Sequence, residues 1–454
     1  MKIGAKFLSA VFVFACCLSA WLPLSFTIAG LNLRLNQLCL PLVLYSYGAR
    51  YLKPPTAWAG FLAGCGLAYW FVLLVSTMTS PALSLSAVGH VVLVGLNLLH
   101  LMAGYMIGCH LADLQKLMRQ FIFSVAALNI VLALVTVATT LGLPVPSSML
   151  TEEAVPILVD GDVVGGTVLR FKFAGVLAGC FSAAAVCVAL ALLLKPRNRR
   201  DQYMLMVGII PCGSGMILGF SRQAFLSLVA GLVIILGFLI FRGRALKIMK
   251  TSAIVGASLL LVTGAVNVLP GGENYLQAFN GRVAQLFESQ TYTTGTASTR
   301  SAMWTGMLED IAANPWRGAG QDAYMKYFPD EGAGSHNGLL EALHAAGILG
   351  FVPWLAFHLA LLVFPSWLLL RGNRDHPDTY LLLGLLASVT ACMLAVLTNL
   401  MFWNATYWLL LGLLAGAARR YSQFFRPERI RTQPRADAPC SLAKCEEQTC
   451  SPPS

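Results

Sequence analysis

Three residues that could take part in chemistry lie at the edges of long apolar runs: Arg222, Arg300 and His336. An arginine binds phosphate and other anions through charge-assisted hydrogen bonds. A histidine titrates near neutral pH and can act as a base. These residue types suit a reaction on an anionic substrate, although each of the three also has an ordinary structural interpretation.

Arg222 lies between two apolar runs, 203–221 and 223–241, each long enough to cross a bilayer once. This spacing predicts a tight helical hairpin with Arg222 at its apex, at the rim of the membrane. In that position the side chain either extends to lipid headgroups or points at an anionic ligand in a cavity. The sequence leaves both interpretations open.

Arg300 follows Ser298 and Thr299, which predict the N-cap of a helix that ends near Asn314-Pro315. An arginine in the first turn opposes the helix dipole. A phosphate at that end would be favoured both by the free N–H groups and by the guanidinium. Otherwise Arg300 is an exposed residue with a small energetic cost.

A second pair of cations, Arg170 and Lys172, stands at the start of the apolar run 168–194. We interpret this pair mainly as flanking charges of a spanning helix. Just before it, Asp160-Gly161-Asp162 superficially resembles a metal–nucleotide-sugar motif, but such a sequence is more often a plain turn, and that is the interpretation we prefer.

His336 follows a glycine-rich stretch and precedes an apolar run that begins at residue 338. Asn337, Glu341 and His344 follow at helical spacing on one face, and polar residues in a spanning helix usually face the bundle interior. We therefore predict a polar stripe that runs from His336 into the bundle. His336 and His344 are too far apart to ligate one metal ion as a helical pair, and a single histidine at an interface can also be structural.

No pattern typical of a cofactor site accompanies these residues. The sequence contains no Walker loop, no dinucleotide fingerprint and no hydrolase nucleophile elbow. The spacing of Cys440, Cys445 and Cys450 fits no common zinc pattern. We therefore expect neither a metal nor a cofactor. The energy for any reaction must then come with the substrate, and an activated lipid phosphate would suit an outer face that has no ATP.

The composition indicates which medium surrounds the elements that carry these residues. Of 454 residues, 57% are hydrophobic and 11% are charged, whereas soluble globular proteins have about 25% charged residues. The sequence therefore predicts an all-α polytopic membrane protein. About twelve runs are long enough to span the bilayer: 7–29, 31–49, 57–78, 87–109, 120–142, 168–194, 203–221, 223–241, 251–269, 338–370, 379–399 and 403–418.

Positive charge is distributed unevenly between the two sides of such a bundle. The chain has 31 lysine and arginine residues, and all but eight fall in one alternating set of loops. By the positive-inside rule, this places both termini in the cytoplasm. The net charge of +11 thus reflects membrane topology rather than binding to nucleic acid. The eight on the other side are Arg34, Arg170, Lys172, Arg222, Arg282, Arg300, Arg317 and Lys326.

Hydropathy divides the chain into four parts. Residues 1–270 hold the first nine spans, and residues 271–336 form a large periplasmic loop with amphipathic helices. Residues 337–420 hold the last three spans, and residues 421–454 form a disordered cytoplasmic tail. The N-terminal segment could also be a cleaved signal peptide, but its apolar run is longer than a usual signal core, so we expect a retained first helix.

Three motifs, in this order along the chain, resemble the O-antigen ligase/polymerase superfamily of bacterial envelope proteins. The last motif matches the family's spacing without a gap, and together the motifs span about residues 220–350. They are Ser221-Arg222 at the start of an apolar helix, Arg300-x3-Trp304 with Asn314-Pro315-x2-Gly318-x-Gly320, and His336-Asn337-x9-Gly347-x2-Gly350.

The resemblance implies an O-antigen ligase, an inverting glycosyltransferase of lipopolysaccharide maturation at the periplasmic face of the inner membrane. Its donor would be O-antigen linked to undecaprenyl pyrophosphate and its acceptor lipid A–core oligosaccharide, without metal or ATP. By motif position, Arg222 and Arg300 would bind the pyrophosphate and His336 would be catalytic. We assign supporting roles to Ser221, Asn337, Arg170, Lys172 and Trp304.

Other functions remain open. O-antigen polymerases and protein O-oligosaccharyltransferases belong to the same superfamily, and the single dominant outer loop favours a ligase over a polymerase. A transporter or flippase for a lipid-linked glycan is an alternative of another class. Transporters often show two related halves and ionisable residues near the midplane, whereas here the unusual charges gather at the outer rim, which favours the enzyme.

Overall fold

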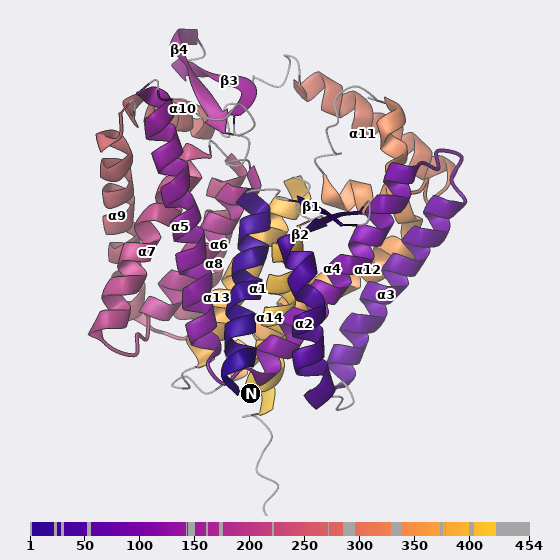
Figure 1. Ribbon diagram of the computed structural model, residues 1–454, viewed down its shortest axis with the longest axis horizontal. Helices are drawn as coiled ribbons and strands as arrows, with labels where there is room; N and C mark the ends of the chain where they lie inside the picture. The colour runs from indigo at the N-terminus through magenta and orange to yellow at the C-terminus, as the bar shows by residue number, and fades with distance from the viewer. Residues whose placement is uncertain are drawn as a thin grey trace, which may run out of the picture.

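The computed structural model shows a bundle of long helices (Figure 1). Among the residues that the structure describes, it contains fourteen α-helices, a 3-10 helix and two β-hairpins. The described residues are 2–21, 25–28, 31–51, 56–141, 143, 150–159, 162–171, 176–219, 222–270, 272–284, 296–327, 337–372, 376, 378–398 and 404–423.

Twelve of these helices coincide with the expected spans. Eight described helices are long and apolar enough to cross a membrane, and shorter apolar segments, Gly4–Ser19 and Ala178–Leu193, lie in two others. The chain is therefore an integral, polytopic membrane protein. The twelve are α1 (Lys2–Trp21), α2 (Leu35–Tyr51), α3 (Ala57–Met78), α4 (Leu85–His110), α5 (Leu114–Thr140), α6 (Val176–Leu193), α7 (Arg199–Leu218), α8 (Arg222–Phe241), α9 (Ala245–Val268), α12 (Gly338–Arg371), α13 (Asp378–Thr398) and α14 (Ala405–Ser422).

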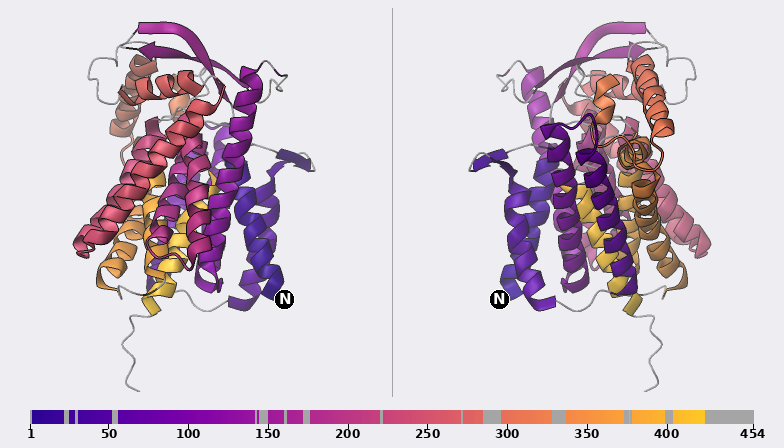
Figure 2. Two further views of the ribbon diagram at one scale, coloured as in Figure 1. Left: turned by 90° about the vertical axis from the view of Figure 1, so that its left-hand side faces the viewer. Right: turned by 90° about the vertical axis from the view of Figure 1, so that its right-hand side faces the viewer.

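The connections that have structure of their own gather at one end of the bundle, which we call the loop end (Figures 1 and 2). Two helices of the predicted large loop, α10 (Gly272–Ala284) and α11 (Thr296–Ala313), lie there, together with the 3-10 helix η2 (Ala323–Tyr327). Both β-hairpins lie at the same end, and the N-terminus lies at the opposite end.

The predicted fold class, an all-α polytopic membrane protein, is confirmed, and the two β-hairpins are small additions at the loop end that the sequence did not predict. The first ends α1 at Trp21, whereas the expected span reached residue 29. The second occupies the beginning of the expected span 168–194, so α6 begins only at Val176. A hydropathy profile does not distinguish a short apolar strand from the end of a spanning helix. The strands are β1 (Ser25–Ile28), β2 (Leu31–Arg34), β3 (Leu150–Val159) and β4 (Asp162–Phe171).

Of the Asp160-Gly161-Asp162 sequence, the structure describes only Asp162, which begins β4. Val159 pairs with Asp162 across two antiparallel strands. Residues 160 and 161 lie outside the described residues, so the plain-turn interpretation stays a prediction.

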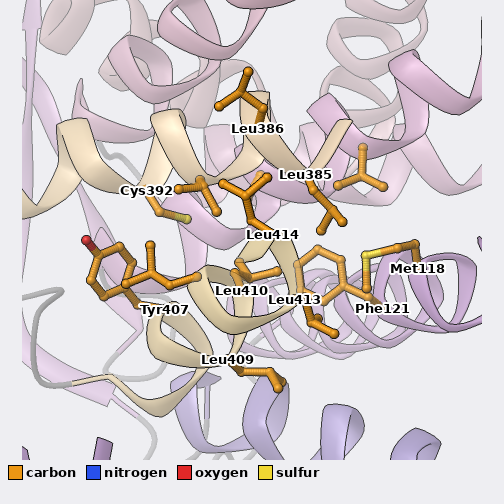
Figure 3. Close-up of a cluster of buried hydrophobic side chains, with 14 of the residues drawn as sticks. Met118, Phe121, Leu385, Leu386, Cys392, Tyr407, Leu409, Leu410, Leu413 and Leu414 are labelled. Atoms are coloured by element: carbon orange, nitrogen blue, oxygen red, sulfur yellow. The ribbon is translucent and has the colours of Figure 1, made fainter. Parts of the chain in front are cut away.

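The centre of the bundle depends on close contact between α4 and α14. A Cβ atom on Gly104 would lie 2.4 Å from the carbonyl oxygen of Leu409, and one on Gly412 would lie 2.1 Å from that of Leu101. In a lipid environment, small residues of this kind let two backbones approach and gain dispersion energy. Figure 3 shows the apolar side chains of α13 and α14 that fill the core beside this contact.

Helix α12 is broken at Gly347. Its φ of +59° and ψ of −170° are not helical, and only glycine adopts this backbone conformation freely. Residues 314–321, which we call the docked segment, fill the break and bond to the backbone groups on both sides of it. The bonds are Ala319 N–H to His344 O (2.8 Å), Gly320 N–H to Ala345 O (3.0 Å), Ile348 N–H to Pro315 O (2.8 Å) and Leu349 N–H to Trp316 O (3.2 Å).

The docked segment leaves no room for side chains at the contact. A Cβ atom on Gly347 would lie 2.4 Å from the carbonyl oxygen of Trp316, and one on Gly318 would lie 2.4 Å from the Gly347 nitrogen. The end of α3 holds the segment from the other side, because the Ser76 and Ser80 hydroxyls donate 2.6 Å hydrogen bonds to the carbonyls of Arg317 and Ala319. Gly318 and Gly347, which belong to two different sequence motifs, are therefore both required by the contact between the docked segment and α12.

We predict that Gly347→Ala destabilises the protein. The new Cβ atom would meet the docked segment, and the left-handed conformation alone costs about 1–2 kcal/mol for a residue with a side chain. Thermal unfolding of the purified protein in detergent measures the loss. Gly64→Ala in α3 is the matched control, because nothing lies within 4 Å of a Cβ at that position. Equal unfolding temperatures for the two variants would contradict the prediction.

Candidate active site

The three motif residues stand at or near the starts of three helices at the loop end. Arg222 is the first residue of α8, and Arg300 lies near the start of α11. His336 lies outside the described residues, directly before Asn337, which caps α12. Ser221 and Lys172 also lie outside the described residues, and Arg170 belongs to β4. The catalytic and phosphate-binding assignments remain predictions.

The predicted cap of α11 is wrong. The helix begins at Thr296, so Ser298 and Thr299 lie inside it and Arg300 is its fifth residue. Only the first four N–H groups of a helix lack intrahelical partners. Arg300, as the fifth residue, comes after these four groups in the chain. An anion bound by these N–H groups would lie beyond residues 296–299, and Arg300 would have to reach back toward it.

Two residues expected to support the site have clear structural roles. The Asn337 side chain accepts a 3.1 Å hydrogen bond from the Leu340 N–H and so fixes the first turn of α12. Trp304 is half-buried and packs in a small cluster with Met303, Met307 and Tyr324. These contacts hold α11 against η2 and fix the chain immediately after His336.

The polar stripe on α12 is buried, as the helical spacing predicts. Glu341 is 8% exposed and His344 1%. His344 Nε2 lies 2.9 Å from a carboxylate oxygen of Asp310, whose other oxygen accepts a 2.7 Å hydrogen bond from Lys326. Burial opposes ionisation of Asp310, but the bonds with His344 and Lys326 outweigh it and lower its pKa. The ionised carboxylate thus joins α11 to α12.

A second polar cluster at the loop end joins α4 to the end of the docked segment. His90 Nδ1 lies 2.5 Å from a carboxylate oxygen of Asp322, whose side chain is 4% exposed. Gln321 donates a 2.9 Å hydrogen bond to the other Asp322 oxygen and lies 3.5 Å from Glu341 of the polar stripe. Burial would raise the pKa of Asp322, but the bonds with His90 and Gln321 give a net lowering.

Sequence reasoning did not find this second cluster. His90 stands inside an apolar run, and Asp322 is distant from it along the chain. Asp322 has a φ of +59°, and aspartate is among the few residues with side chains that adopt this conformation at low cost, but the sequence alone does not reveal this backbone conformation. Among the residues that the structure describes, no group of three His, Cys, Asp or Glu side chains could hold a metal ion.

An apolar cavity of about 430 Å³ lies between α6, α7, α8 and α9, and α10 contributes to its wall. On α8 its lining begins at Phe225, one turn after Arg222, and continues at Leu228, Val229 and Leu232. Residues spaced in this way form one face of a helix. The cavity therefore extends along α8 from Phe225, one turn after the start of the helix, toward the middle of the bundle.

The fold and this arrangement define a membrane protein with a candidate site at one end of its bundle. Residues 206–355 match the family model described as O-antigen ligase, and this range contains all three motifs. A stretch of 102 residues is 35% identical to an O-antigen ligase of Pseudomonas aeruginosa and covers 21% of this chain. It spans 24% of that relative. The resemblance to the O-antigen ligase/polymerase superfamily is thus confirmed.

We predict that Asp322→Asn lowers the unfolding temperature. Asparagine tolerates the same backbone conformation but removes a buried charge whose hydrogen bonds contribute about 1–3 kcal/mol. Because the folded pKa is lowered, this contribution is present above about pH 4 and is lost as the pH falls through the folded value. The difference from the wild type should therefore shrink in acid.

Glu309→Gln is the control for this prediction, because Glu309 is an exposed carboxylate nearby on α11. Thermal unfolding of both variants between pH 3 and 7 is the measurement. If Asp322→Asn and the wild type have the same unfolding temperature at pH 7, the Asp322 carboxylate does not stabilise the loop end.

Proposed function

We propose that this protein is a glycosyltransferase that moves O-antigen polysaccharide from undecaprenyl pyrophosphate to lipid A–core oligosaccharide, completing lipopolysaccharide. The apolar cavity along α8, whose lining begins one turn after Arg222, carries the proposal. The match of residues 206–355 to the O-antigen ligase family supports it, as does the partial similarity to the O-antigen ligase of Pseudomonas aeruginosa.

A lipid-linked pyrophosphate has two chemically different parts, and the surroundings of α8 suit both. The long hydrocarbon tail needs an apolar site that is continuous with the bilayer. The cavity is lined almost entirely by apolar side chains of spanning helices. The charged head needs cations at the membrane rim, and Arg222 begins α8 one turn before the cavity lining on that helix starts. A tail in the cavity would bring the pyrophosphate to that end of α8.

The reaction assigns a separate role to each motif residue. His336 accepts the proton of an acceptor hydroxyl, whose oxygen attacks the anomeric carbon of the donor sugar. The bond between that carbon and the pyrophosphate oxygen breaks, and undecaprenyl pyrophosphate leaves with the electron pair. Arg222 and Arg300 stabilise the charge that develops on the leaving group. Attack from the face opposite the leaving group inverts the anomeric configuration.

The other predicted residues act around this centre. Asn337 fixes the start of α12 and so fixes the backbone next to His336. Trp304 packs α11 in place, which sets the position of Arg300. Ser221 precedes Arg222 in the chain. Arg170, near the end of β4, adds positive charge at the same end of the bundle, and we assign the same supporting role to Lys172, which follows β4 in the chain.

We place the site on the periplasmic face of the inner membrane, with both termini in the cytoplasm. The excess of lysine and arginine in the opposite set of loops supports this orientation. No nucleotide is available on the periplasmic side, and the proposed reaction needs none, because cleavage of the donor's bond to pyrophosphate supplies the driving force. We expect no metal ion or cofactor to take part.

We predict that a strain without this protein makes bare lipid A–core and accumulates lipid-linked polymer on an envelope-glycan gel. If the protein were a polymerase, its loss would instead leave core capped by a single repeat. If it were a flippase, its loss would leave the lipid-linked glycan on the cytoplasmic side. Re-expression of the wild type should restore the polymer on the core.

His336→Ala should fail to restore the polymer at normal protein level, because no base would remain for the acceptor hydroxyl. His376→Ala, just before α13 at the end of the bundle opposite the loop end, is the matched histidine control and should restore it. Unchanged glycan in the His336→Ala strain would rule out the catalytic assignment.

A further inference from the structure

A polar cavity of about 500 Å³ lies at the loop end, apart from the apolar cavity. One wall is the end of α3 with the connection to α4, and the other is the segment from Asp310 to Lys326. This volume is in the range of small-molecule sites, roughly 300–1,000 Å³. Its polar lining comprises Ser76, Thr79, Ser80, Asp310, Asn314, Arg317 and Lys326.

The side chains of this cavity divide into those that build it and those that are available to a ligand. Ser76 and Ser80 donate hydrogen bonds to the docked segment. Asp310 holds His344 and Lys326. The side chains of Asn314 and Arg317 are exposed, and among the described residues neither has a hydrogen bond or ion pair. An amide and a guanidinium therefore remain for recognition.

The polar groups in the cavity suit a hydroxyl-rich ligand. Asp310 places an ionised carboxylate in the lining, and its pairing with Lys326 leaves Arg317 as the cation of the lining that is available to a ligand. A sugar hydroxyl both donates and accepts, so it can bond to an amide or a guanidinium. Asn314 and Arg317 offer these two groups in the lining.

The position of the cavity suits a long glycan rather than the reacting sugar. Asp310 contacts His344, which stands seven residues after Asn337 on α12. At 1.5 Å per residue, this contact is about 10 Å along the helix from the predicted catalytic position. A sugar in the cavity would therefore lie at least one sugar ring away from His336, within reach of the same oligosaccharide chain.

The walls of the cavity are held rigidly. The docked segment is bonded to both sides of the break in α12, and Gln321 N–H donates a 3.0 Å hydrogen bond to the hydroxyl of Thr77 in α3. A preformed site loses less conformational entropy when a flexible glycan binds. Asn314 and Arg317 are thus presented from backbone that is already fixed.

We propose that this cavity is a saccharide-binding subsite in which Asn314 and Arg317 recognise sugar hydroxyls. The saccharide belongs either to the acceptor core oligosaccharide or to the donor polysaccharide. These two candidates rest on the proposed function. Recognition of sugar hydroxyls is common to both sources. The subsite selects the glycan and does not take part in bond cleavage.

The test is a binding titration with the purified full-length protein in detergent. One probe is water-soluble, deacylated lipid A–core oligosaccharide, and the other is O-polysaccharide released from its lipid. We expect the wild type to bind one of them and Asn314→Ala with Arg317→Gln to weaken that binding by roughly tenfold or more. Glu309→Gln is the control, because Glu309 is exposed on α11 but does not line the cavity.

Each outcome has a separate meaning. Weaker binding of the core probe assigns the cavity to the acceptor, and weaker binding of the polysaccharide assigns it to the donor. Unchanged binding in the double variant, no binding of either probe to the wild type, or competition by inorganic phosphate alone overturns the subsite. Equal unfolding temperatures of the double variant and Glu309→Gln show that any loss is local.

His336→Ala distinguishes the subsite from the proposed reaction. This variant should bind the probe like the wild type while it transfers no glycan. If it transfers normally, the catalytic assignment fails and the subsite stands. If it binds normally and the double variant does not, the subsite is independent of the chemistry.

Discussion

The loop end of this protein depends on a backbone contact in which the docked segment, residues 314–321, fills the break in α12 at Gly347. Breaking a helix inside a membrane protein exposes backbone groups that cost several kcal/mol each when they lack partners. Here the carbonyls and N–H groups beside the break bond to the docked segment. The loop and the helix therefore complete each other, and neither would be stable in this form alone.

This contact connects the parts of the candidate site. The docked segment follows α11, which carries Arg300, and it is bonded to the helix whose first residues follow His336. The hydrogen-bonded contacts of Asp310 with His344 and of Asp322 with His90 add side-chain bonds to α12 and α4 from residues on the two sides of this segment. The predicted catalytic histidine and one predicted phosphate-binding arginine are thus connected through a short, rigid path.

Much of the helical architecture was predictable, because a bilayer requires long apolar helices. The buried stripe of Glu341 and His344 followed from helical spacing. The β-hairpins, the true start of α11 at Thr296 and the His90–Asp322 pair were missed. The first two depend on local backbone choices that hydropathy does not resolve, and the pair joins residues distant in sequence. The glycine motifs were visible in the sequence, but the backbone-to-backbone contact that requires them is visible only in the structure.

The central claim is that a polyprenyl-linked donor lies with its tail in the apolar cavity along α8 while its glycan is transferred. The most direct measurement is the initial rate of transfer from undecaprenyl-pyrophosphate-linked glycan to lipid A–core by the purified protein, with Val229→Trp and Val233→Trp. Val229 lines the cavity, whereas Val233 is on the same helix, exposed and outside it. We expect transfer by the wild type and Val233→Trp, and a raised KM for the donor in Val229→Trp. No transfer by the wild type, or equal KM values in all three, would contradict the claim.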